Sequence, residues 1–182
     1  MSGNSRFKLR SYAGLRPLLR YCGEAAVIGV ILFGVYAYQA RNLLPADWQA
    51  APALNVPMLD GSSYNLGDHA VPATLVYFFA PWCHVCAASS DNIKHLGNLR
   101  DEDELRIVLV ALDWQTRSEV RQYVSRHEIA NTVLLGDRKV ANDWNVSAFP
   151  TYYILDSRQR VVRRDLGYST LAGLWWRTMV AR

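Results

Sequence analysis

Two cysteines three positions apart are the residues of this chain best suited to chemistry. Cys83 and Cys86 enclose His84 and Val85, and the third cysteine, Cys22, lies far away in the N-terminal segment. Three cysteines are too few for a framework of structural disulfides, so the close spacing indicates a reactive pair. Such a dithiol can exchange with other disulfides through thiolate attack, and this chemistry needs no bound cofactor.

The predicted local structure assigns a different role to each cysteine. If a helix begins at Cys83 and runs to about Leu99, the two sulfurs lie one turn apart on the same face, close enough for a disulfide. The unpaired N–H groups and positive potential of a helix N-terminus favour a thiolate at Cys83. Cys86 lies one turn deeper and is expected to be shielded. We therefore predict Cys83 as the nucleophile and Cys86 as the resolving thiol.

Two other roles for the pair were weighed against redox chemistry. A zinc site needs two more ligands, usually a second Cys/His pair at similar spacing. The histidines His69, His95 and His127 are scattered singly, so we predict no metal site. A purely structural bridge across so short a loop would add little stability.

The segments around the pair predict an α/β domain. The apolar, aromatic run Ala73–Ala80 is typical of a strand buried on both faces, and Pro81-Trp82 end it just before the cysteines. Leu105–Leu112 predicts a second buried strand. The remaining predicted elements are a short strand and turn at Met58–Gly61, a helix at Ser118–His127, a strand at Thr132–Leu135, a helical turn at Lys139–Trp144, strands at Thr151–Leu155 and Val161–Arg164, and a helix at Leu171–Val180. Strands alternating with helices, followed by a hairpin and a last helix, predict a mixed central sheet.

The N-terminal segment predicts a membrane anchor. Residues 25–38 carry no charge, and residues 22–40 contain Glu24 as their only charge, which gives about the length that a helix needs to cross a bilayer. A buried core helix is the alternative. We favour a transmembrane helix because five basic residues precede the stretch and the whole domain follows it. Basic flanks stay in the cytoplasm, so we predict a single-pass protein of the bacterial inner membrane with its domain in the periplasm.

A cleaved signal peptide is a further alternative for this segment. Cleavage requires small residues at positions −3 and −1, and a cut after Ala40 would place Tyr38 at −3, so we favour an uncleaved anchor. Cys22 is interpreted as an inert thiol at the membrane boundary. The predicted segments are a basic cytoplasmic tail (1–21), the transmembrane anchor (22–40), a linker and start of the domain (41–57), and the domain itself (58–182).

The net charge of +4 comes from the N-terminal tail. Residues 1–21 contain five basic residues and no acid, whereas residues 42–182 contain 14 Lys and Arg against 15 Asp and Glu, a net charge of −1. A phosphate-binding surface needs clustered positive charge on the domain itself. We therefore exclude nucleic acid as the partner.

The chain resembles the thioredoxin-like superfamily in three places. These are Leu75–Cys86 (LVYFFAPWCHVC), Phe149-Pro150-Thr151 ahead of a predicted strand, and Asp156 in the turn after it. The resemblance implies a thioredoxin-like fold and a cis peptide bond before Pro150, which faces the cysteine pair while Phe149 offers backbone to a substrate. An ordinary proline at the start of a strand is the alternative. Trp82, His84 and Val85 are expected to form or tune the surface that a substrate meets.

The subfamily can be narrowed to the TlpA/ResA/DsbE group. The tethered domain, the segment PALNVPMLDG and the 67 positions from Cys83 to Pro150 are similar to this group, in which Trp114–Leu135 would supply an inserted helix and strand. The similarity covers residues 50–180. Membrane-tethered reductases of cytochrome c maturation and of copper stress share this outline. The resemblance implies a reductase of protein disulfide or dithiol clients, recharged by a membrane electron donor of the DsbD type.

Two departures from the superfamily matter, one for proton transfer at Cys86 and the other for the direction of electron flow. Thioredoxins keep a buried acid six residues before the first cysteine, where this chain has Tyr77, so proton transfer at Cys86 must use water or another group. His84 could stabilise the Cys83 thiolate, which would make the disulfide more oxidising, or it could be a solvated side chain. The alternatives are a disulfide oxidase or isomerase, and a copper- or haem-handling binding protein that uses the dithiol as a soft-metal ligand.

Overall fold

The computed structural model of the protein describes residues 15–68 and 71–181. Most of the basic tail and His69 lie outside the described residues. The chain divides into two units, residues 1–38 and residues 39–182. Each unit is described by itself below.

The first unit contains one long helix. Helix α1 spans Leu15–Ala40, and its part from Tyr21 to Ala40 is long and apolar enough to cross a membrane, with a mean hydropathy of 1.5. Its large apolar side chains are exposed, Val30 to 71% and Phe33 to 70%. A core helix of a soluble domain would bury such side chains instead. By length and composition, this part of the helix is a candidate membrane span.

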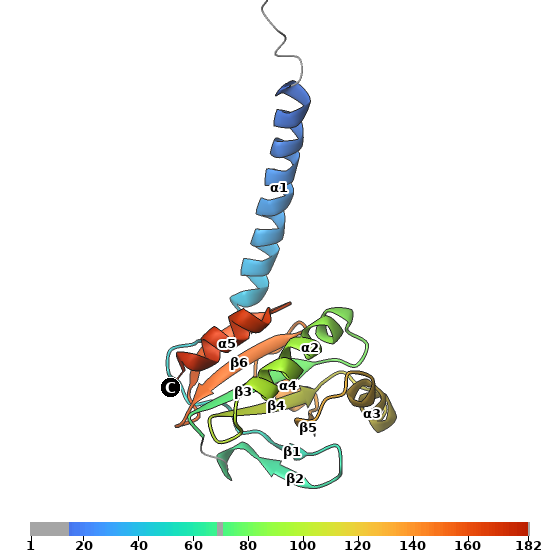
Figure 1. Ribbon diagram of the computed structural model, residues 1–182, viewed down its shortest axis with the longest axis vertical. Helices are drawn as coiled ribbons and strands as arrows, with labels where there is room; N and C mark the ends of the chain where they lie inside the picture. Colours follow the sequence, from blue (N-terminus) through green and yellow to red (C-terminus); the bar gives the residue numbers. More distant parts are fainter. Residues whose placement is uncertain (1–14, 69–70, 182) are drawn as a thin grey trace, which may run out of the picture. The chain divides into compact units, whose positions relative to one another are not determined.

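The second unit is built on a five-stranded mixed sheet in the order β5-β4-β3-β6-β7 (Figure 1). The strands are β3 (Ala73–Phe79), β4 (Leu105–Ala111), β5 (Thr132–Leu135), β6 (Thr151–Asp156) and β7 (Val161–Leu166). Central strand β3 pairs in parallel with β4 and antiparallel with β6, and all seven of its residues are buried. The continuous apolar run at this position therefore correctly predicts a strand covered on both faces.

Helices cover both faces of the sheet. They are α2 (His84–Leu99), α3 (Arg117–Arg126), α4 (Arg138–Asp143) and α5 (Leu171–Met179). Side chains of β3 alternate between two cores: Tyr77 joins the one that contains residues of α2, α3 and α5, whereas Phe78 joins the one that contains residues of α4. Elements α3 and β5 lie where the resemblance implies an inserted helix and strand. The architecture is the predicted thioredoxin-like α/β fold.

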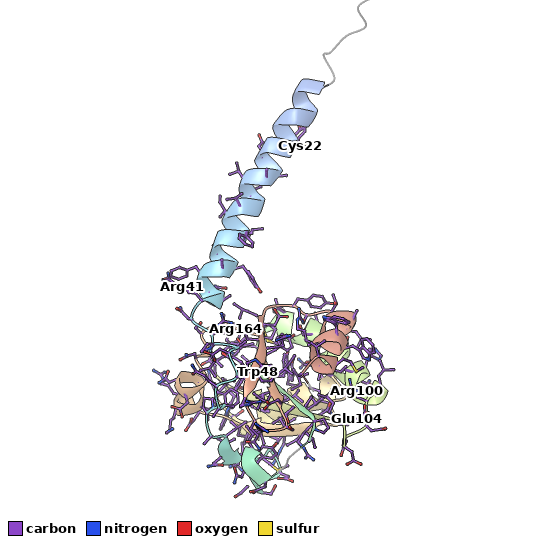
Figure 2. The ribbon with its side chains drawn as sticks, turned by 90° about the vertical axis from the view of Figure 1, so that its left-hand side faces the viewer. Cys22, Arg41, Trp48, Arg100, Glu104 and Arg164 are labelled. Carbon is purple, nitrogen blue, oxygen red and sulfur yellow. A yellow bond between two sulfur atoms is a disulfide. The ribbon has the colours of Figure 1, made fainter. Side chains whose placement is uncertain are left out.

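Residues 41–57, expected as a linker and start of the domain, contribute to its core. Leu43 is 4% exposed and Leu54 is fully buried. The guanidinium of Arg164, labelled in Figure 2, donates hydrogen bonds of 2.8 and 3.0 Å to the carbonyl oxygens of Leu43 and Leu44. The three prolines of this segment each lack a backbone N–H donor, which is why its sequence is typical of a linker.

The predicted strand at Met58–Gly61 was wrong in position. The strand at this point is β1 (Asn55–Pro57), which pairs antiparallel with β2 (Ser63–Asn65) ahead of a short 3-10 helix at Leu66–Asp68. Met58 makes only an isolated bridge to Leu134, and the Gly61 N–H closes a turn on the Met58 carbonyl oxygen at 3.0 Å. The Asp-Gly turn signal is correct, because Gly61 has a φ of 97° that suits glycine.

The turn between β6 and β7 is organised by the carboxylate of Asp156. This carboxylate accepts hydrogen bonds from the backbone N–H groups of Arg158 (3.0 Å) and Arg160 (2.8 Å), and from the Arg160 guanidinium at 2.6 and 2.8 Å. Burial alone would raise the pKa of Asp156, but these hydrogen bonds outweigh burial and lower it. Because the pKa is lower in the folded state, the stability that this group contributes is present above its unfolded pKa and is lost as the pH falls through its folded pKa.

Replacing Asp156 by Ala should lower the free energy of unfolding at neutral pH by about 2 kcal/mol, because partly buried donors lose a charged acceptor. Between neutral pH and about pH 3, the variant should also lose less stability than the wild type, since the carboxyl no longer titrates. Urea unfolding of the detergent-solubilised protein at several pH values measures both effects. The control Asp143→Ala removes an exposed pair with Lys139 and should cost less than about 1 kcal/mol. Equal losses in the two variants would contradict this account of the turn.

Candidate active site

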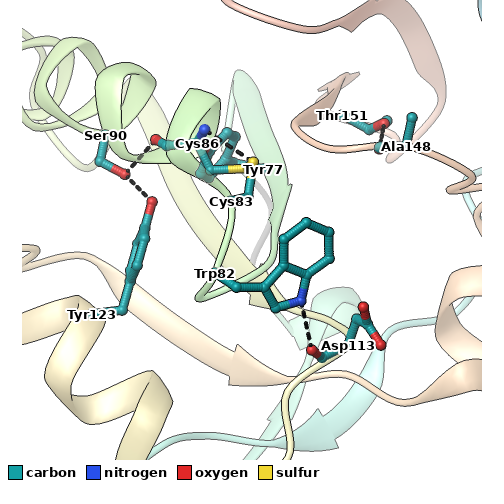
Figure 3. Close-up of a disulfide and its surroundings, with 9 residues drawn as sticks. All are labelled: Tyr77, Trp82, Cys83, Cys86, Ser90, Asp113, Tyr123, Ala148 and Thr151. Carbon is teal, nitrogen blue, oxygen red and sulfur yellow. Dashed lines mark hydrogen bonds between the residues drawn. A yellow bond between two sulfur atoms is a disulfide. The ribbon is translucent and has the colours of Figure 1, made fainter.

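The cysteine pair lies where strand β3 ends and helix α2 begins, as Figure 3 shows. The chain turns after Phe79, and the Cys83 N–H closes this turn on the Ala80 carbonyl oxygen at 3.0 Å. Cys83 is the N-cap residue of α2, with an extended backbone (φ −82°, ψ 108°), and His84 is the first helical residue. The predicted strand, turn and helix are therefore present, with the first cysteine at the helix N-terminus.

The two cysteines form a disulfide, but their surroundings differ. Their Cα atoms are 5.2 Å apart, Cys83 keeps 7% of its surface exposed, and Cys86 is fully buried. The backbone N–H of Cys86 donates to the Cys83 Sγ at 3.1 Å, so one of the free N–H groups of the helix start points at this sulfur. The positive end of the helix dipole lies at the same place. Negative charge is therefore stabilised on the sulfur of Cys83 more than on that of Cys86.

A cluster of hydroxyl groups lies behind Cys86. Tyr77, fully buried on β3, donates a hydrogen bond of 3.0 Å to the Cys86 carbonyl oxygen. The Ser90 hydroxyl donates to the same oxygen at 3.0 Å and lies 2.8 Å from the Tyr123 hydroxyl (Figure 3). Tyr77, at the position where the resemblance implies a buried acid, thus contacts the backbone of Cys86.

The phenols of this cluster are neutral at physiological pH. Burial raises the pKa of Tyr77 well above its ordinary value and raises that of Tyr123 as well. A protonated phenol can donate a hydrogen bond but is a poor base. The group at the position of the buried acid therefore cannot take up the proton of Cys86 in the way a carboxylate can.

Trp82 forms an exposed apolar surface beside the pair. It is 60% exposed, and its indole N–H donates to the Asp113 carbonyl oxygen at 3.2 Å. Its ring meets that of Phe149 edge to face, with centroids 5.9 Å apart. The first contact holds the indole to the loop after β4, and the second brings it to the loop before β6. A cavity of about 350 Å³ between these two loops is lined by Asp113 and Phe149 among others.

The peptide bond between Phe149 and Pro150 is cis, as the resemblance implies. The loop is held from both sides of this bond. The Thr151 hydroxyl donates to the Ala148 carbonyl oxygen at 2.8 Å, and the Pro150 carbonyl oxygen accepts from the Gly167 N–H at 2.8 Å. Pro150 itself has no N–H to donate, so the polar groups of this loop are fixed by its neighbours.

The structure brings together most of the predicted site residues but also contains partners that the sequence did not indicate. His84 and Val85 are exposed in the first turn of α2, and within the described chain His84 makes no hydrogen bond to either sulfur. Ser90 and Tyr123 were missed. Ser90 could have been found as the residue one turn after Cys86 on the same helix face, whereas its contact with Tyr123 depends on how α3 packs against α2.

No metal site was predicted at the cysteine pair. Within residues 15–68 and 71–181, no three His, Cys, Asp or Glu side chains gather into a group that could hold a metal ion. His95 and His127, which the structure describes, belong to no such group. Redox exchange between thiols remains the chemistry that this geometry suits.

Comparison with known proteins places the chain in a family. Residues 47–172 match the Redoxin family. The chain is 26% identical to the thioredoxin-like protein YneN of Bacillus subtilis, covering 79% of this chain and 89% of YneN, and 23% identical to the thiol-disulfide oxidoreductase ResA of Bacillus cereus, covering 84% and 86%.

A solved structure shares the fold. The crystal structure of a thiol:disulfide interchange protein of the thioredoxin family from Chlorobium tepidum superposes with a TM-score of 0.68 at 19% identity, covering 76% of this chain and 99% of that protein. The match of the family to more than half of the chain, the shared fold and the cysteine pair at the start of α2 agree. The chain therefore belongs to the Redoxin family, as a thiol–disulfide oxidoreductase with a thioredoxin-like fold.

Proposed function

We propose that this chain is a membrane-anchored disulfide reductase in which Cys83 is the nucleophile and Cys86 the resolving thiol. The observation that carries the proposal is the asymmetry of the pair. Cys83 keeps 7% of its surface exposed and its sulfur accepts a backbone N–H, whereas Cys86 has no exposed surface. A client disulfide can reach the first sulfur and not the second, which supports this assignment of roles.

The proposed reaction transfers two electrons to the client. The Cys83 thiolate attacks one sulfur of the client disulfide, which forms a mixed disulfide and releases the other client sulfur as a thiolate. That thiolate takes the proton of the Cys86 thiol. The Cys86 thiolate then attacks the Cys83 Sγ, which forms the Cys83–Cys86 disulfide and releases the second client sulfur. The client ends as a dithiol, and the membrane donor returns the pair to its reduced state.

The proposed client surface surrounds the Cys83 sulfur. Trp82 and Val85 expose 60% and 46% of their surfaces, and both are apolar side chains next to the cysteines in the chain. Phe149 contacts Trp82 and precedes the cis Pro150, which we propose faces the dithiol. In this proposal a client chain packs on Trp82 and Val85 and pairs with the backbone of Phe149.

The proposed location is the periplasmic side of a bacterial inner membrane, with residues 22–40 as an uncleaved anchor and a donor of the DsbD type. The exposed apolar helix and the basic residues before it support this topology. A tether of this kind confines the domain to a thin layer at the membrane, which raises its effective concentration toward partners held there.

Cys86→Ala should accumulate mixed disulfides with clients, because Cys83 still attacks but nothing resolves the product. Purification from cells under acid quench, followed by non-reducing electrophoresis, measures the captured species. Cys83→Ala is the matched control and should capture almost none. Equal capture by the two variants, or more by Cys83→Ala, would overturn the assignment of roles.

The reduction potential of the Cys83–Cys86 couple distinguishes a reductase from an oxidase. A reductase should have a potential closer to the value of thioredoxin, about −270 mV, than to that of DsbA, about −120 mV. Equilibration of the purified protein with redox buffers, followed by alkylation and mass analysis, measures it. A potential near the DsbA value would contradict the reductase proposal and favour the oxidase alternative.

A reporter fused after Arg41 tests the topology. Alkaline phosphatase, which is active only outside the cytoplasm, should be active in this fusion, because the basic N-terminal flank stays inside. A matched fusion before residue 22 should be inactive. The opposite pattern of activity would show that the domain faces the cytoplasm and would contradict the proposed location.

A further inference from the structure

We propose that Tyr77 is a positioning residue for thiol–disulfide exchange, which acts by holding the peptide of Cys86 so that the resolving attack on Cys83 is fast. In this proposal Tyr77 does not contact the client, and it acts through the backbone of Cys86. The inference rests on one part of the proposed function, thiol–disulfide exchange by Cys83 and Cys86. It does not depend on the direction of electron flow.

The backbone of Cys86 is held on both sides. Its N–H donates to the Cys83 Sγ at 3.1 Å, and its carbonyl oxygen accepts the hydroxyls of Tyr77 and Ser90, both at 3.0 Å. The two hydroxyl bonds involve no sulfur atom, so they can form whether the pair is a disulfide or a dithiol. They therefore fix the direction of the Cys86 side chain during the step in which its sulfur must find that of Cys83.

Tyr77 is itself held firmly. It lies in the central strand β3 with no exposed surface, and its ring packs near-parallel to that of Phe79 at 5.9 Å and tilted against that of Tyr152 at 4.9 Å. The second donor is held as well, because the Ser90 hydroxyl is hydrogen-bonded to that of Tyr123 at 2.8 Å. Donors with so little freedom hold their acceptor at a small entropic cost.

The hydroxyl group of Tyr77 has a different role from that of a carboxylate at the same position. A buried acid can accept the proton of the resolving thiol, whereas a neutral phenol contributes a directed hydrogen bond and no base. In this chain the Cys86 proton goes to the client thiolate released in the first step, as in the reaction above. Tyr77 accordingly affects the geometry of the second step and leaves the first step unchanged.

The test separates the two steps with Ellman's reagent, an aromatic disulfide that releases one coloured thiolate at each step. The full chain, with Cys22 replaced by Ser, is reduced, solubilised in detergent and mixed with the reagent in a stopped-flow instrument. In Tyr77→Phe the first release, from attack by Cys83, should keep its wild-type rate within about twofold. The second release, from attack by Cys86, should slow about five- to tenfold, the factor expected for one lost hydrogen bond.

Two further variants make the result specific. Ser90→Ala removes the second donor and should also slow only the second release, and it carries the test if Tyr77→Phe does not fold. Tyr152→Phe is the matched control, since it removes a buried phenol beside Tyr77 whose hydroxyl makes no hydrogen bond to Cys86 in the described chain. Both releases should keep their rates in this control.

The outcomes distinguish this inference from the proposed function. An unchanged second release in Tyr77→Phe and in Ser90→Ala would overturn the positioning role, and so would an equal slowing of both releases, which is what a general loss of structure produces. If the wild type released only one thiolate, the assignment of nucleophile and resolving thiol would fail first. A potential in the oxidase range would contradict the reductase direction and leave the positioning role standing.

Discussion

At the start of helix α2, the peptide of Cys86 stands between the Cys83 sulfur, which accepts its N–H, and the Tyr77 hydroxyl, which donates to its carbonyl oxygen. This pair of contacts requires that a helix begin one short turn after a buried strand. Strand β3 meets the requirement because it is central in the sheet and paired on both sides, so its end cannot shift without breaking the ladders with β4 and β6. The position of the Cys83 sulfur thus follows from a central strand whose residues are all buried.

The fold makes two chemically identical side chains unequal. One sulfur caps the helix, where free N–H groups and the helix dipole favour its negative charge, and its residue keeps 7% of its surface exposed. The other is buried one turn later, where loss of solvent disfavours charge. A dithiol with this asymmetry can attack in a defined order, which a symmetric pair could not. Beside the pair, Trp82 packs edge to face against Phe149, the residue before the cis Pro150.

The sequence predicts those parts of the structure that depend on local pattern. The sequence correctly predicts strand β3, the helix after Cys83 and the strands that follow. Burial on both faces and helical packing each produce a recognisable pattern of apolar residues. The cis bond at Pro150 was implied only by the resemblance, since proline occurs at the start of many strands in the trans form.

Other features depend on packing between distant segments and could not be read from the sequence. The strand β1 was placed three residues late because a Pro-rich segment gives a weak strand signal, and only its pairing with β2 determines its register. The contact between Ser90 and Tyr123 joins two helices that are separated by a strand in the chain. Tyr77 was recognised as a departure from the thioredoxin pattern, but its bond to the Cys86 carbonyl oxygen appears only once β3 and α2 are packed together.

The most direct test of the central claim compares how the two sulfurs ionise. Ultraviolet absorbance of the thiolate at neutral pH can be measured in two reduced variants, Cys86→Ala and Cys83→Ala, each with Cys22 replaced by Ser. The account predicts strong thiolate absorbance when Cys83 is the remaining cysteine and little when Cys86 remains. Equal absorbance in the two variants, or the stronger signal from Cys86, would contradict the claim that the start of helix α2 makes Cys83 the nucleophile.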